Sequence, residues 1–390
     1  MENKNSLKII SVVGARPNFM KIAPFVTAIN TFNSSNDSLF VEHILVHSGQ
    51  HYDGRMSRQF FENLGIPNAN INLGIGSGSH AEQVGQTMIA FEKVLRLHKP
   101  DWVVVVGDVN ATLACSVTAK KEWVKCCHIE AGLRSGDIHM PEEINRVVTD
   151  HISDLLLTPD RISYNNLLLE GIPKEKIRFV GNIMIDTLDA NKRIAEQLNL
   201  REVVHGNLLE STNLNLEIED GNFAIVTLHR PSNVDDQVIL TNLVHFLLNV
   251  VSNDLIIVWP VHPRTLNNMQ QFGLADLLVS NDRIFLTHPI GYHEMLRLNM
   301  GAKLMLTDSG GLQEECTVLG TPCLTLRWNT ERPITLAQHG GASILVGNNI
   351  SRMKDEYEGI KNQVRKPRRP ELWDGAAAGR CLKEIVEAEK

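Results

Sequence analysis

The segment CHIEAGLRSGDIHMPEEINR gathers many charged side chains directly behind an apolar run. Asp108 ends the run VVVVGD and Glu130 ends the run HIE, so parallel strands would bring both carboxylates to the same edge of one sheet. Glu142 follows a proline and is expected to begin a helix, with Arg146 one turn later on the same face. Carboxylates beside arginine and an apolar sheet are suited to proton transfer. A purely structural interpretation also stays open, in which Glu142 and Arg146 are an i,i+4 ion pair and Asp108 is a helix cap.

A second polar cluster lies in LTDSGGLQEECTVLG. We expect a strand to end at Thr307 and a helix to begin near Leu312, with the turn formed by Ser309, Gly310 and Gly311 between them. Bare backbone amides at a helix start bind anions, and glycines let a diphosphate approach the backbone closely. A tight turn with a serine cap is the structural alternative. The helix then carries two acidic residues, Glu314 and Glu315, either of which could accept hydrogen bonds from ribose hydroxyls or form a capping box.

Basic side chains follow the first strand of each half of the chain. Arg16 comes after the first apolar run, between Gly14 and Pro17, and His229 follows the run FAIVTL in the second half. Both are expected to bind an anion, and Lys21 lies on the first helix, where it could face the same site. The chain contains neither G-x-G-x-x-G nor G-x-x-x-x-G-K-[ST], which argues against a simple dehydrogenase or a P-loop NTPase. The histidines lack metal-site spacing, so no metal is expected.

The elements that position these residues alternate between strands and helices. Apolar runs without alternation, each followed by a polar turn and a helical period, recur in both halves and predict parallel sheets covered by helices. We therefore predict an α/β fold with two Rossmann-like domains facing a central cleft. The predicted ranges are 1–185 for the N-terminal domain with the carboxylates, 186–365 for the C-terminal domain, and 366–390 for a helix that crosses back to the first domain.

Composition excludes several classes of protein. The 390 residues carry a formal net charge of -7, whereas a nucleic-acid binder needs a basic surface. The six cysteines show no C-x-x-C spacing, which is typical of reduced thiols in a cytosolic protein. The apolar run at the N-terminus is broken by GARP and is too short for a signal sequence or a membrane span. We expect a cytoplasmic protein that binds neither nucleic acid nor membranes.

Ten motifs occur in order over nearly the whole chain: GARPNFMKIAP, GQHYD, GDVNATLA, HIEAGLRSGD, MPEEINR, TDHISDLL, TLHRPSN, HPRT, TDSGGLQEE and TERP. Together they resemble the non-hydrolysing UDP-N-acetylglucosamine 2-epimerase family. The resemblance implies a glycosyltransferase-B-type fold, a homodimer, and the interconversion of UDP-GlcNAc and UDP-ManNAc for cell-surface polysaccharides, without a metal or nicotinamide. It implies a catalytic set of Asp108, Glu130, Glu142, Lys21 and Arg146, and a UDP-binding set of Arg16, His229, Ser309, Gly310, Gly311 and Glu315.

The implied chemistry needs these groups. No carbonyl lies next to carbon 2 to stabilise a carbanion, so UDP can be expelled from carbon 1 as the proton leaves, giving a 2-acetamidoglucal. The departing diphosphate needs cations and amides, and carbon 2 needs an acid and a base. Which carboxylate acts on which face of carbon 2 is left open.

Two positions depart from the family pattern, and several alternatives stay open. Ile334 stands in TERPI where glutamate is common, and Ser48 stands where threonine is frequent. The first departure leaves the substrate contacts of that loop open. The alternatives are an epimerase acting on UDP-2,3-diacetamido-2,3-dideoxyglucuronate, a hydrolysing epimerase, a glycosyltransferase of the same fold, and a non-enzymatic sugar-nucleotide binder.

Overall fold

The chain divides into two units, and the boundary between them lies after Ala190. The computed structural model describes residues 5–36, 38–49, 68–209 and 217–389. Unit 1 comprises Met1–Ala190 and Pro370–Lys390, and unit 2 comprises Asn191–Arg369. Apart from Gly49, the motif GQHYD lies outside the described residues.

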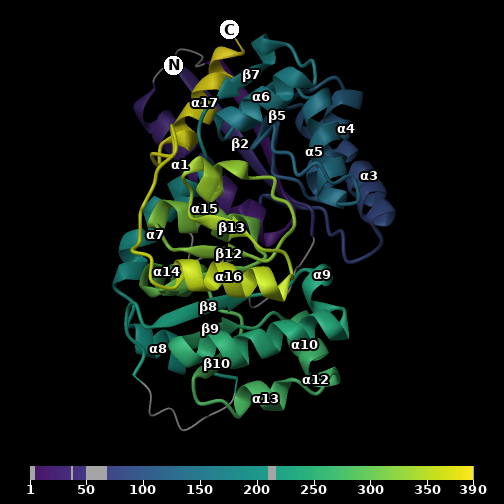
Figure 1. The fold of residues 1–390 in the computed structure, drawn as a ribbon. Helices are drawn as coiled ribbons and strands as arrows, with labels where there is room; N and C mark the ends of the chain where they lie inside the picture. Colours follow the sequence, from purple (N-terminus) through teal and green to yellow (C-terminus); the bar gives the residue numbers. More distant parts are fainter. Residues whose placement is uncertain (1–4, 37, 50–67, 210–216, 390) are drawn as a thin grey trace. The chain divides into compact units, whose positions relative to one another are not determined.

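Unit 1 is built on a seven-stranded sheet whose described pairings are all parallel (Figure 1). The strand order is β3-β2-β1-β4-β5-β6-β7. The central strand β4 reads WVVVV and is buried along its whole length, as expected for a strand covered on both faces. The strands are β1 (Asn5–Val13), β2 (Leu39–His47), β3 (Ile71–Asn72), β4 (Trp102–Val106), β5 (Lys125–Ile129), β6 (Leu155–Thr158) and β7 (Ile177–Phe179).

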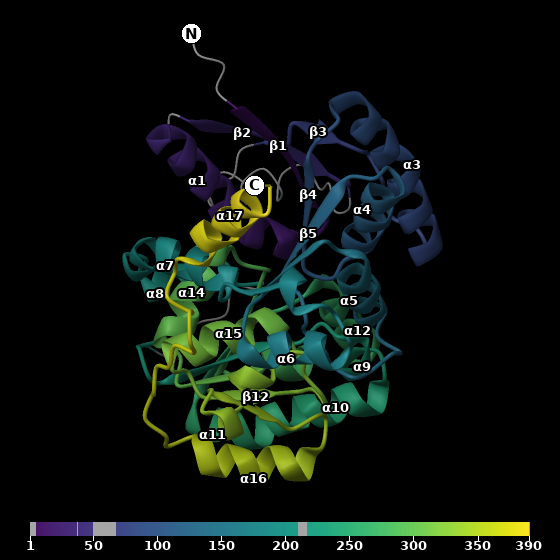
Figure 2. The ribbon, with the colours of Figure 1, turned by 90° about the horizontal axis from the view of Figure 1, so that it is seen from above.

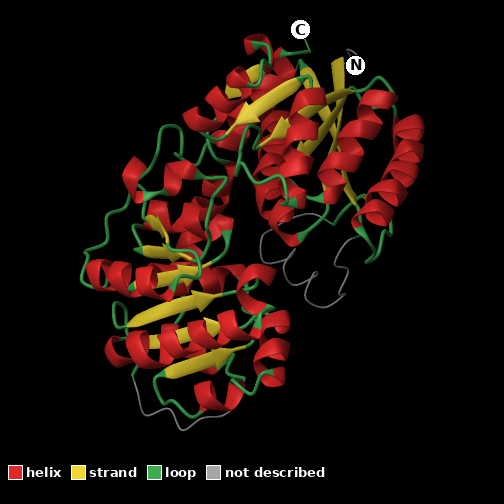
Figure 3. Cartoon of the chain, turned by 45° about the vertical axis from the view of Figure 1, so that its right-hand side comes forward, coloured by secondary structure: helices red, strands yellow, loops and turns green. Residues whose placement is uncertain are grey.

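Helices cover both faces of this sheet (Figure 3). Phe91 and Val94 of α3 and Ala111 and Cys115 of α4 form one core cluster with apolar residues of the central strands. The division between the units falls within α7. The helices are α1 (Arg16–Ser35), α3 (His80–His98), α4 (Asn110–Lys121), α5 (Pro141–Ile152), α6 (Arg161–Leu169), α7 (Ile183–Glu196), α17 (Ala377–Glu387) and the short η1 (Lys174–Lys176).

Unit 2 contains a second parallel sheet, with the order β10-β9-β8-β11-β12-β13. Successive side chains of β8 point to opposite faces: Ala224 and Val226 join one core cluster, whereas Phe223 and Ile225 join another. Both faces of the sheet are therefore packed. The strands are β8 (Phe223–Thr227), β9 (Ile256–Pro260), β10 (Ile284–Thr287), β11 (Leu304–Thr307), β12 (Cys323–Thr325) and β13 (Ser343–Leu345).

The helices of unit 2 connect these strands in the order predicted from the sequence. The helix predicted near Leu312 begins at Gly310, directly after the strand that ends at Thr307. The helices are α8 (Leu200–His205), α9 (Pro231–Val234), α10 (Gln237–Phe246), η2 (Leu247–Val251), α11 (Ser252–Asp254), α12 (Pro263–Gln271), α13 (Ala275–Val279), α14 (Tyr292–Gly301), α15 (Gly310–Leu319), η3 (Pro333–Thr335), η4 (Ala337–His339) and α16 (Ile350–Ile360). The prediction of two Rossmann-like α/β units is thus confirmed.

Each sheet has one point where the strand order reverses. In unit 1 the reversal lies between β1 and β4, and in unit 2 it lies between β8 and β11. Loops that leave neighbouring strands in opposite directions open a crevice at such a point, where ligands of α/β sheets bind. The loops after β1 and β4 begin the segments with Arg16 and Asp108, and those after β8 and β11 contain His229 and Ser309. The topology therefore positions most of the predicted site residues.

The C-terminal segment packs within unit 1, where α17 lies beside α1 (Figure 2). The indole N–H of Trp373 donates to the carbonyl of Pro159 at 2.9 Å. The carboxylate of Asp186 accepts from the backbone N–H groups of Ala377 and Ala378, at the start of α17. Among the helices of the described residues, none is both long and apolar enough to cross a bilayer.

Candidate functional site

In unit 1 the site begins where β4 and β5 end. Gly107 and Asp108 follow β4, and Glu130 follows β5. Glu130 has φ +75°, a left-handed conformation that is uncommon for a residue other than glycine and that is found at functional sites. The backbone N–H groups of Glu130 and Ala131 both donate to the carbonyl of Leu157, at 3.0 and 3.1 Å. This sharp turn directs the carboxylate of Glu130 back towards the end of β4.

Glu130 forms a buried ion pair with Lys21 of α1. Glu130 is only 4% exposed and Lys21 only 5%, so water screens neither charge and each charge stabilises the other. Gly107 passes directly over the pair, because a Cβ added there would lie 3.0 Å from Lys21 Nζ and 3.4 Å from Glu130 Oε2. Asn18 fixes the same corner: its Nδ2 donates to the carbonyl of Val106 at 2.8 Å, and its Oδ1 accepts from two amides after β1.

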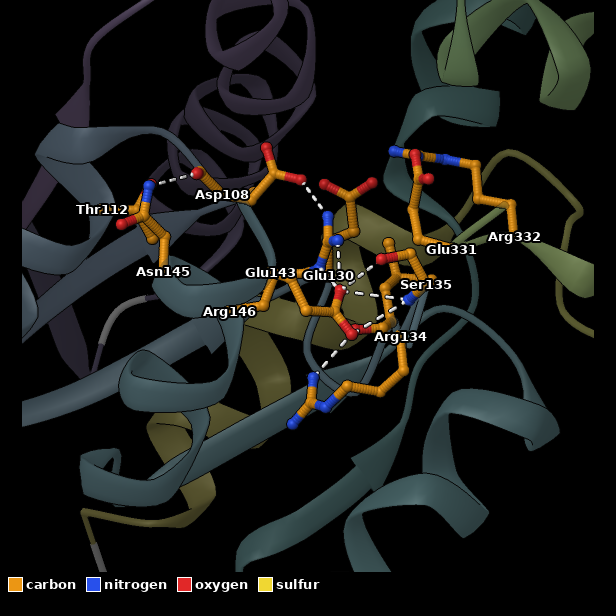
Figure 4. A network of polar contacts seen from close by, with 12 residues as sticks. Asp108, Thr112, Glu130, Arg134, Ser135, Glu143, Asn145, Arg146, Glu331 and Arg332 are labelled. Carbon is orange, nitrogen blue, oxygen red and sulfur yellow. Dashed lines mark hydrogen bonds and ion pairs between the residues drawn. The ribbon is translucent and has the colours of Figure 1, made fainter. Parts of the chain in front are cut away.

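Arg146 holds two carboxylates at this edge of the sheet (Figure 4). Its Nη1 donates to Asp108 Oδ2 and its Nη2 to Glu143 Oε2, both at 2.5 Å, and the residue is 1% exposed. Glu143 also accepts from the N–H and hydroxyl of Ser135 and from the N–H of Gly136. Burial alone would raise the pKa of Glu143, but these hydrogen bonds and the charge of Arg146 lower it below its ordinary value. Asp108 and Glu130 thus each have their own buried cation.

The two remaining predicted residues of unit 1 are Glu142 and Arg16. Glu142 is exposed in the first turn of α5, so the acidic partner of Arg146 on this helix is its neighbour Glu143. The pairing on α5 therefore has i,i+3 spacing instead of the i,i+4 spacing inferred from the sequence. Arg16 is the first residue of α1, and its side chain lies outside the described part of the structure.

In unit 2 the buried carboxylate of Asp308 organises the loop after β8. It accepts from the backbone N–H groups of His229 and Arg230 and from Nδ2 of Asn233. The imidazole Nδ1 of His229 lies 2.7 Å from Asp308 Oδ1, so this nitrogen carries a proton and Nε2 is left for a ligand. Burial alone would raise the pKa of Asp308, but its bonds with His229 and the Arg230 amide lower it. Asp308 is therefore an anion that orients His229.

A second histidine lies beside His229. The ring centroids of His229 and His262 are 5.9 Å apart. His262 caps α12, where its Nδ1 accepts from the N–H of Arg264, and a nitrogen that accepts carries no proton. Burial, followed by the nearby His229, lowers the pKa of His262. His262 is therefore neutral and occupied by its capping contact, whereas His229 is the histidine whose Nε2 remains for a ligand. No group of three histidine, cysteine or acidic residues that could hold a metal occurs among the described residues.

The start of α15 has the geometry of an anion site. Ser309 is the N-cap residue, and Gly310 and Gly311 are the first two residues of the helix, all half-buried. A Cβ added at Gly310 would lie 2.6 Å from Glu331 Oε1 and 2.7 Å from Arg332 Nη1. Both of those side chains are buried and ion-paired to each other, and Arg332 Nε also donates to Glu314. A side chain at this position would therefore have to displace the ends of Glu331 and Arg332 in the TERP loop that packs against it.

Glu315 lies on α15 and is 3% exposed. Burial raises its pKa to about 7, although Tyr292 and Asn299 offset part of the rise. Its Oε2 atom is buried and has no hydrogen-bond partner among the described residues. Of the two acidic residues, Glu314 is engaged by Arg332, so Glu315 is the one whose carboxylate is suited to a hydroxyl-bearing ligand.

The raised pKa of Glu315 predicts a pH-dependent stability. The carboxyl group has its ordinary pKa of 4.5 in the unfolded chain and a pKa of about 7 in the folded protein, so the folded state binds its proton more tightly. Stability therefore falls as pH rises from about 4.5 to about 7. Glu315→Gln removes this dependence, so the variant should gain about 3 kcal/mol relative to the parent over this window. Urea unfolding of both proteins at several pH values measures the difference, and a constant difference across the window contradicts the prediction.

Several residues of the site were not identified from the sequence. Glu143 and Asp308 adjoin predicted residues in the motifs PEEINR and TDSGG, so their acidic side chains were the available signal. Asn18 lies between Arg16 and Lys21 and had no signal beyond its place at a helix start. Their contacts are with residues far along the chain, which the spacing of a motif does not reveal.

Three comparisons with known proteins place the chain in a family. A sequence profile described as UDP-N-acetylglucosamine 2-epimerase matches residues 34–386. The UDP-N-acetylglucosamine 2-epimerase of Methanocaldococcus jannaschii is 42% identical over 97% of this chain and 99% of its own. A crystal structure of that organism's UDP-GlcNAc 2-epimerase in complex with UDP-GlcNAc and UDP superposes with a TM-score of 0.86 at 41% identity, covering 98% of this chain and 100% of the other.

Another relative has a different named substrate. The UDP-2,3-diacetamido-2,3-dideoxy-D-glucuronate 2-epimerase of Pseudomonas aeruginosa is 38% identical, covering 87% of this chain and 88% of its own. It, too, is named as a 2-epimerase of a UDP-sugar. Because the profile covers most of the chain and identity exceeds 40% over nearly its full length, the chain belongs to the UDP-N-acetylglucosamine 2-epimerase family of isomerases.

Proposed function

We propose that this protein interconverts UDP-GlcNAc and UDP-ManNAc by inverting carbon 2, without hydrolysing the substrate. The observation that carries the proposal is the pair of carboxylates at the ends of adjacent strands, Asp108 and Glu130, each held by its own buried cation. Two anchored carboxylates supply the acid and the base that an inversion requires. The relatives named as 2-epimerases of UDP-sugars support the same reaction.

In the proposed reaction a carboxylate takes the proton from carbon 2 while the bond between carbon 1 and the UDP oxygen breaks. The electron pair of the carbon–hydrogen bond forms the double bond of a 2-acetamidoglucal, and UDP leaves with the electrons of the carbon–oxygen bond. A proton is then delivered to the opposite face of carbon 2, and the UDP oxygen attacks carbon 1 again. Atoms and charge balance without a cofactor.

Unit 2 is proposed to bind the UDP group. The amides of Gly310 and Gly311 and the cap residue Ser309 face a diphosphate at the start of α15. His229, oriented by Asp308, is proposed to bind a phosphate oxygen and to stabilise the charge that develops as UDP departs. Arg16 of unit 1 is proposed to add a further cation to the diphosphate. Glu315 is proposed to accept hydrogen bonds from the ribose hydroxyls, since its carboxylate is buried and only partly satisfied.

Unit 1 is proposed to act on the sugar. Asp108, Glu130 and Glu142 are the candidates for the acid and the base at carbon 2. Lys21 keeps Glu130 in place, and Arg146 does the same for Asp108. The different cations beside these two carboxylates give them different environments, which is how two carboxyl groups acquire separate roles.

Proton NMR of UDP-GlcNAc with the protein in heavy water tests the proposed function. We expect deuterium to appear at carbon 2 together with UDP-ManNAc, because solvent exchanges with the catalytic carboxyl group. Accumulation of free sugar and UDP would instead indicate the hydrolysing reaction. An unchanged spectrum with bound UDP would indicate a sugar-nucleotide binder or a glycosyltransferase, and would contradict the proposal.

The second candidate is epimerisation of UDP-2,3-diacetamido-2,3-dideoxyglucuronate, which the Pseudomonas aeruginosa relative favours. Ile334, two residues after the buried Arg332, stands where glutamate is common in the family that the motifs resemble. Loss of a negative charge there would favour a sugar that carries a carboxylate. Measuring kcat/KM for both UDP-sugars distinguishes the two candidates, and a larger value for the uronate would overturn the first.

Three further properties belong to the same proposal. The homodimer implied by the family resemblance is tested by light scattering on the purified protein. A cytoplasmic location is supported by the six cysteines, all of which are buried free thiols. A role in cell-surface polysaccharide synthesis predicts that deleting the gene depletes a polymer that contains N-acetylmannosamine units.

A further inference from the structure

A buried histidine behind the carboxylates has two hydrogen-bond acceptors. His128 lies on β5, and its Nε2 is 2.8 Å from the carbonyl oxygen of Gly107, while its Nδ1 is 2.6 Å from Asp150 Oδ1. Neither His128 nor Asp150 is more than 1% exposed. A neutral imidazole carries only one N–H, and a carbonyl oxygen can only accept, so Nε2 must donate to Gly107.

Asp150 is the ionised partner in this contact. Its Oδ2 accepts from the backbone N–H of Gly132 at 3.1 Å and from Arg134 Nη1 at 2.7 Å. The guanidinium of Arg134 is a permanent cation in direct contact with this oxygen, so Asp150 is held as a carboxylate although it is buried. Since the carboxylate has no proton to give, Nδ1 of His128 also donates, and the ring carries protons on both nitrogens.

These contacts connect the two loops that hold the catalytic carboxylates. Gly107 precedes Asp108, and Gly132 and Arg134 follow Glu130. We propose that Asp150 is a positioning residue: through His128 it fixes the loop after β4, and through Gly132 and Arg134 it fixes the loop after β5. Neither His128 nor Asp150 belongs to the proposed catalytic set, so both act only through the loops that they hold.

The second loop has little freedom to shift once Asp150 holds it. Gly132 has φ +82°, and a Cβ added there would lie 2.3 Å from the carbonyl oxygen of Ser163. The side chain of Asn166 donates to the Gly132 carbonyl at 2.9 Å. Arg134 is held on its other side by Glu170, through hydrogen bonds of 2.7 and 2.8 Å. Loss of the Asp150 carboxylate removes the group that ties this loop to Gly107 through His128.

Three variants test the proposal, which rests on the proposed function for its kinetic readout. Asp150→Ala should lower kcat for epimerisation by about 10- to 100-fold, because small displacements of catalytic groups are costly, while KM changes little. Asp150→Asn should restore most of kcat. Its amide oxygen can accept from the N–H of Gly132, and its NH2 group can donate to Nδ1 of a neutral His128 ring. Such a ring still donates from Nε2 to the carbonyl of Gly107. Asp154→Ala is the matched control, since Asp154 also binds a backbone amide and a cation, but at the opposite end of β5.

Rates are normalised to the number of UDP-binding sites, so that unfolded protein does not count as lost activity. Wild-type kcat in Asp150→Ala overturns the proposal, as does an Asp150→Asn variant that is equally impaired. If Asp150→Ala fails to fold, kcat of Asp150→Asn and NMR of the 15N-histidine-labelled wild type still test the positioning role. NMR should show N–H protons on both ring nitrogens of His128, with loss of the Nδ1 proton in Asp150→Asn; a wild-type ring without a proton on Nε2 contradicts the proposal, because it could not donate to Gly107.

The two readouts separate this proposal from the function on which it rests. A wild-type protein without epimerase activity contradicts the proposed function, but it leaves the doubly protonated ring open to confirmation by NMR. An active enzyme whose His128 ring carries no proton on Nε2 contradicts only the positioning role.

Discussion

Replacing Glu130 by glutamine is expected to lower kcat for epimerisation by about 10²- to 10⁴-fold, the usual range for loss of a general acid or base. The dissociation constant for UDP should stay within about threefold, because the proposed UDP ligands of unit 2 are unchanged. The amide has nearly the shape of the carboxylate, so the left-handed turn after β5 is retained. Steady-state kinetics and calorimetric titration with UDP measure the two quantities.

A double variant separates the loss of a proton-transferring group from the effect of an unpaired buried lysine. Glu130→Gln leaves the ammonium of Lys21 buried without its partner, which could by itself disturb the site. Lys21→Met together with Glu130→Gln removes both charges. If Glu130 transfers a proton, the double variant stays inactive; recovery of turnover would show that the unpaired lysine caused the loss, and turnover within about tenfold of wild type in the single variant would refute the catalytic role.

Arg146→Met is expected to lower the free energy of unfolding by about 3–5 kcal/mol, the usual cost of leaving a buried charge without its partner. The guanidinium is almost fully buried, and it binds Asp108 and Glu143 at 2.5 Å each. Without it Glu143 stays buried beside Ser135 with an uncompensated charge. Adding Glu143→Gln to this variant should restore part of the stability. Urea unfolding of the single and double variants measures both effects.

Arg96→Met is the matched control for this prediction. Arg96 also binds two carboxylates, those of Glu92 and Glu122, but its side chain is 63% exposed. Removing it should cost no more than about 1 kcal/mol, as is usual for exposed ion pairs. The loss in Arg146→Met should also shrink as pH falls, because Glu143 can then take up a proton. Equal losses of unfolding free energy in Arg146→Met and Arg96→Met would show that burial does not make the Arg146 ion pairs more important for stability.

The strand ends were predictable from the sequence because parallel buried strands read as unbroken apolar runs. The apolar parts of VVVVGD and KLMLTD end at Val106 and Leu306, and β4 and β11 end at Val106 and Thr307. Strand order was less accessible, since it depends on which crossovers pack together, although both reversals fall beside predicted site residues. The sequence therefore predicted where each strand ends better than it predicted which strands lie side by side in the sheet.

The carboxylate chosen on α5 shows why the site was only partly predictable. PEEINR contains two adjacent acidic residues, and the phase of the helix decides which one faces the sheet. The helix begins at Pro141 with Met140 as its cap, which turns Glu143 inward and leaves Glu142 exposed. That phase depends on the contacts of Glu143 with Ser135 and Gly136 in the preceding loop. The i,i+4 spacing used to predict the pair considers only residues within the helix and therefore misses these contacts.

In the proposed reaction the bond between carbon 1 and UDP breaks and forms again while both fragments stay bound. UDP-GlcNAc labelled with 18O in the bridging position between carbon 1 and the β-phosphorus tests it directly. We predict that the label spreads to the non-bridging oxygens of the β-phosphate in substrate recovered after partial reaction, because the freed phosphate can rotate before UDP adds back. Epimerisation that proceeds with the label confined to the bridging position would rule out cleavage of the bond between carbon 1 and UDP.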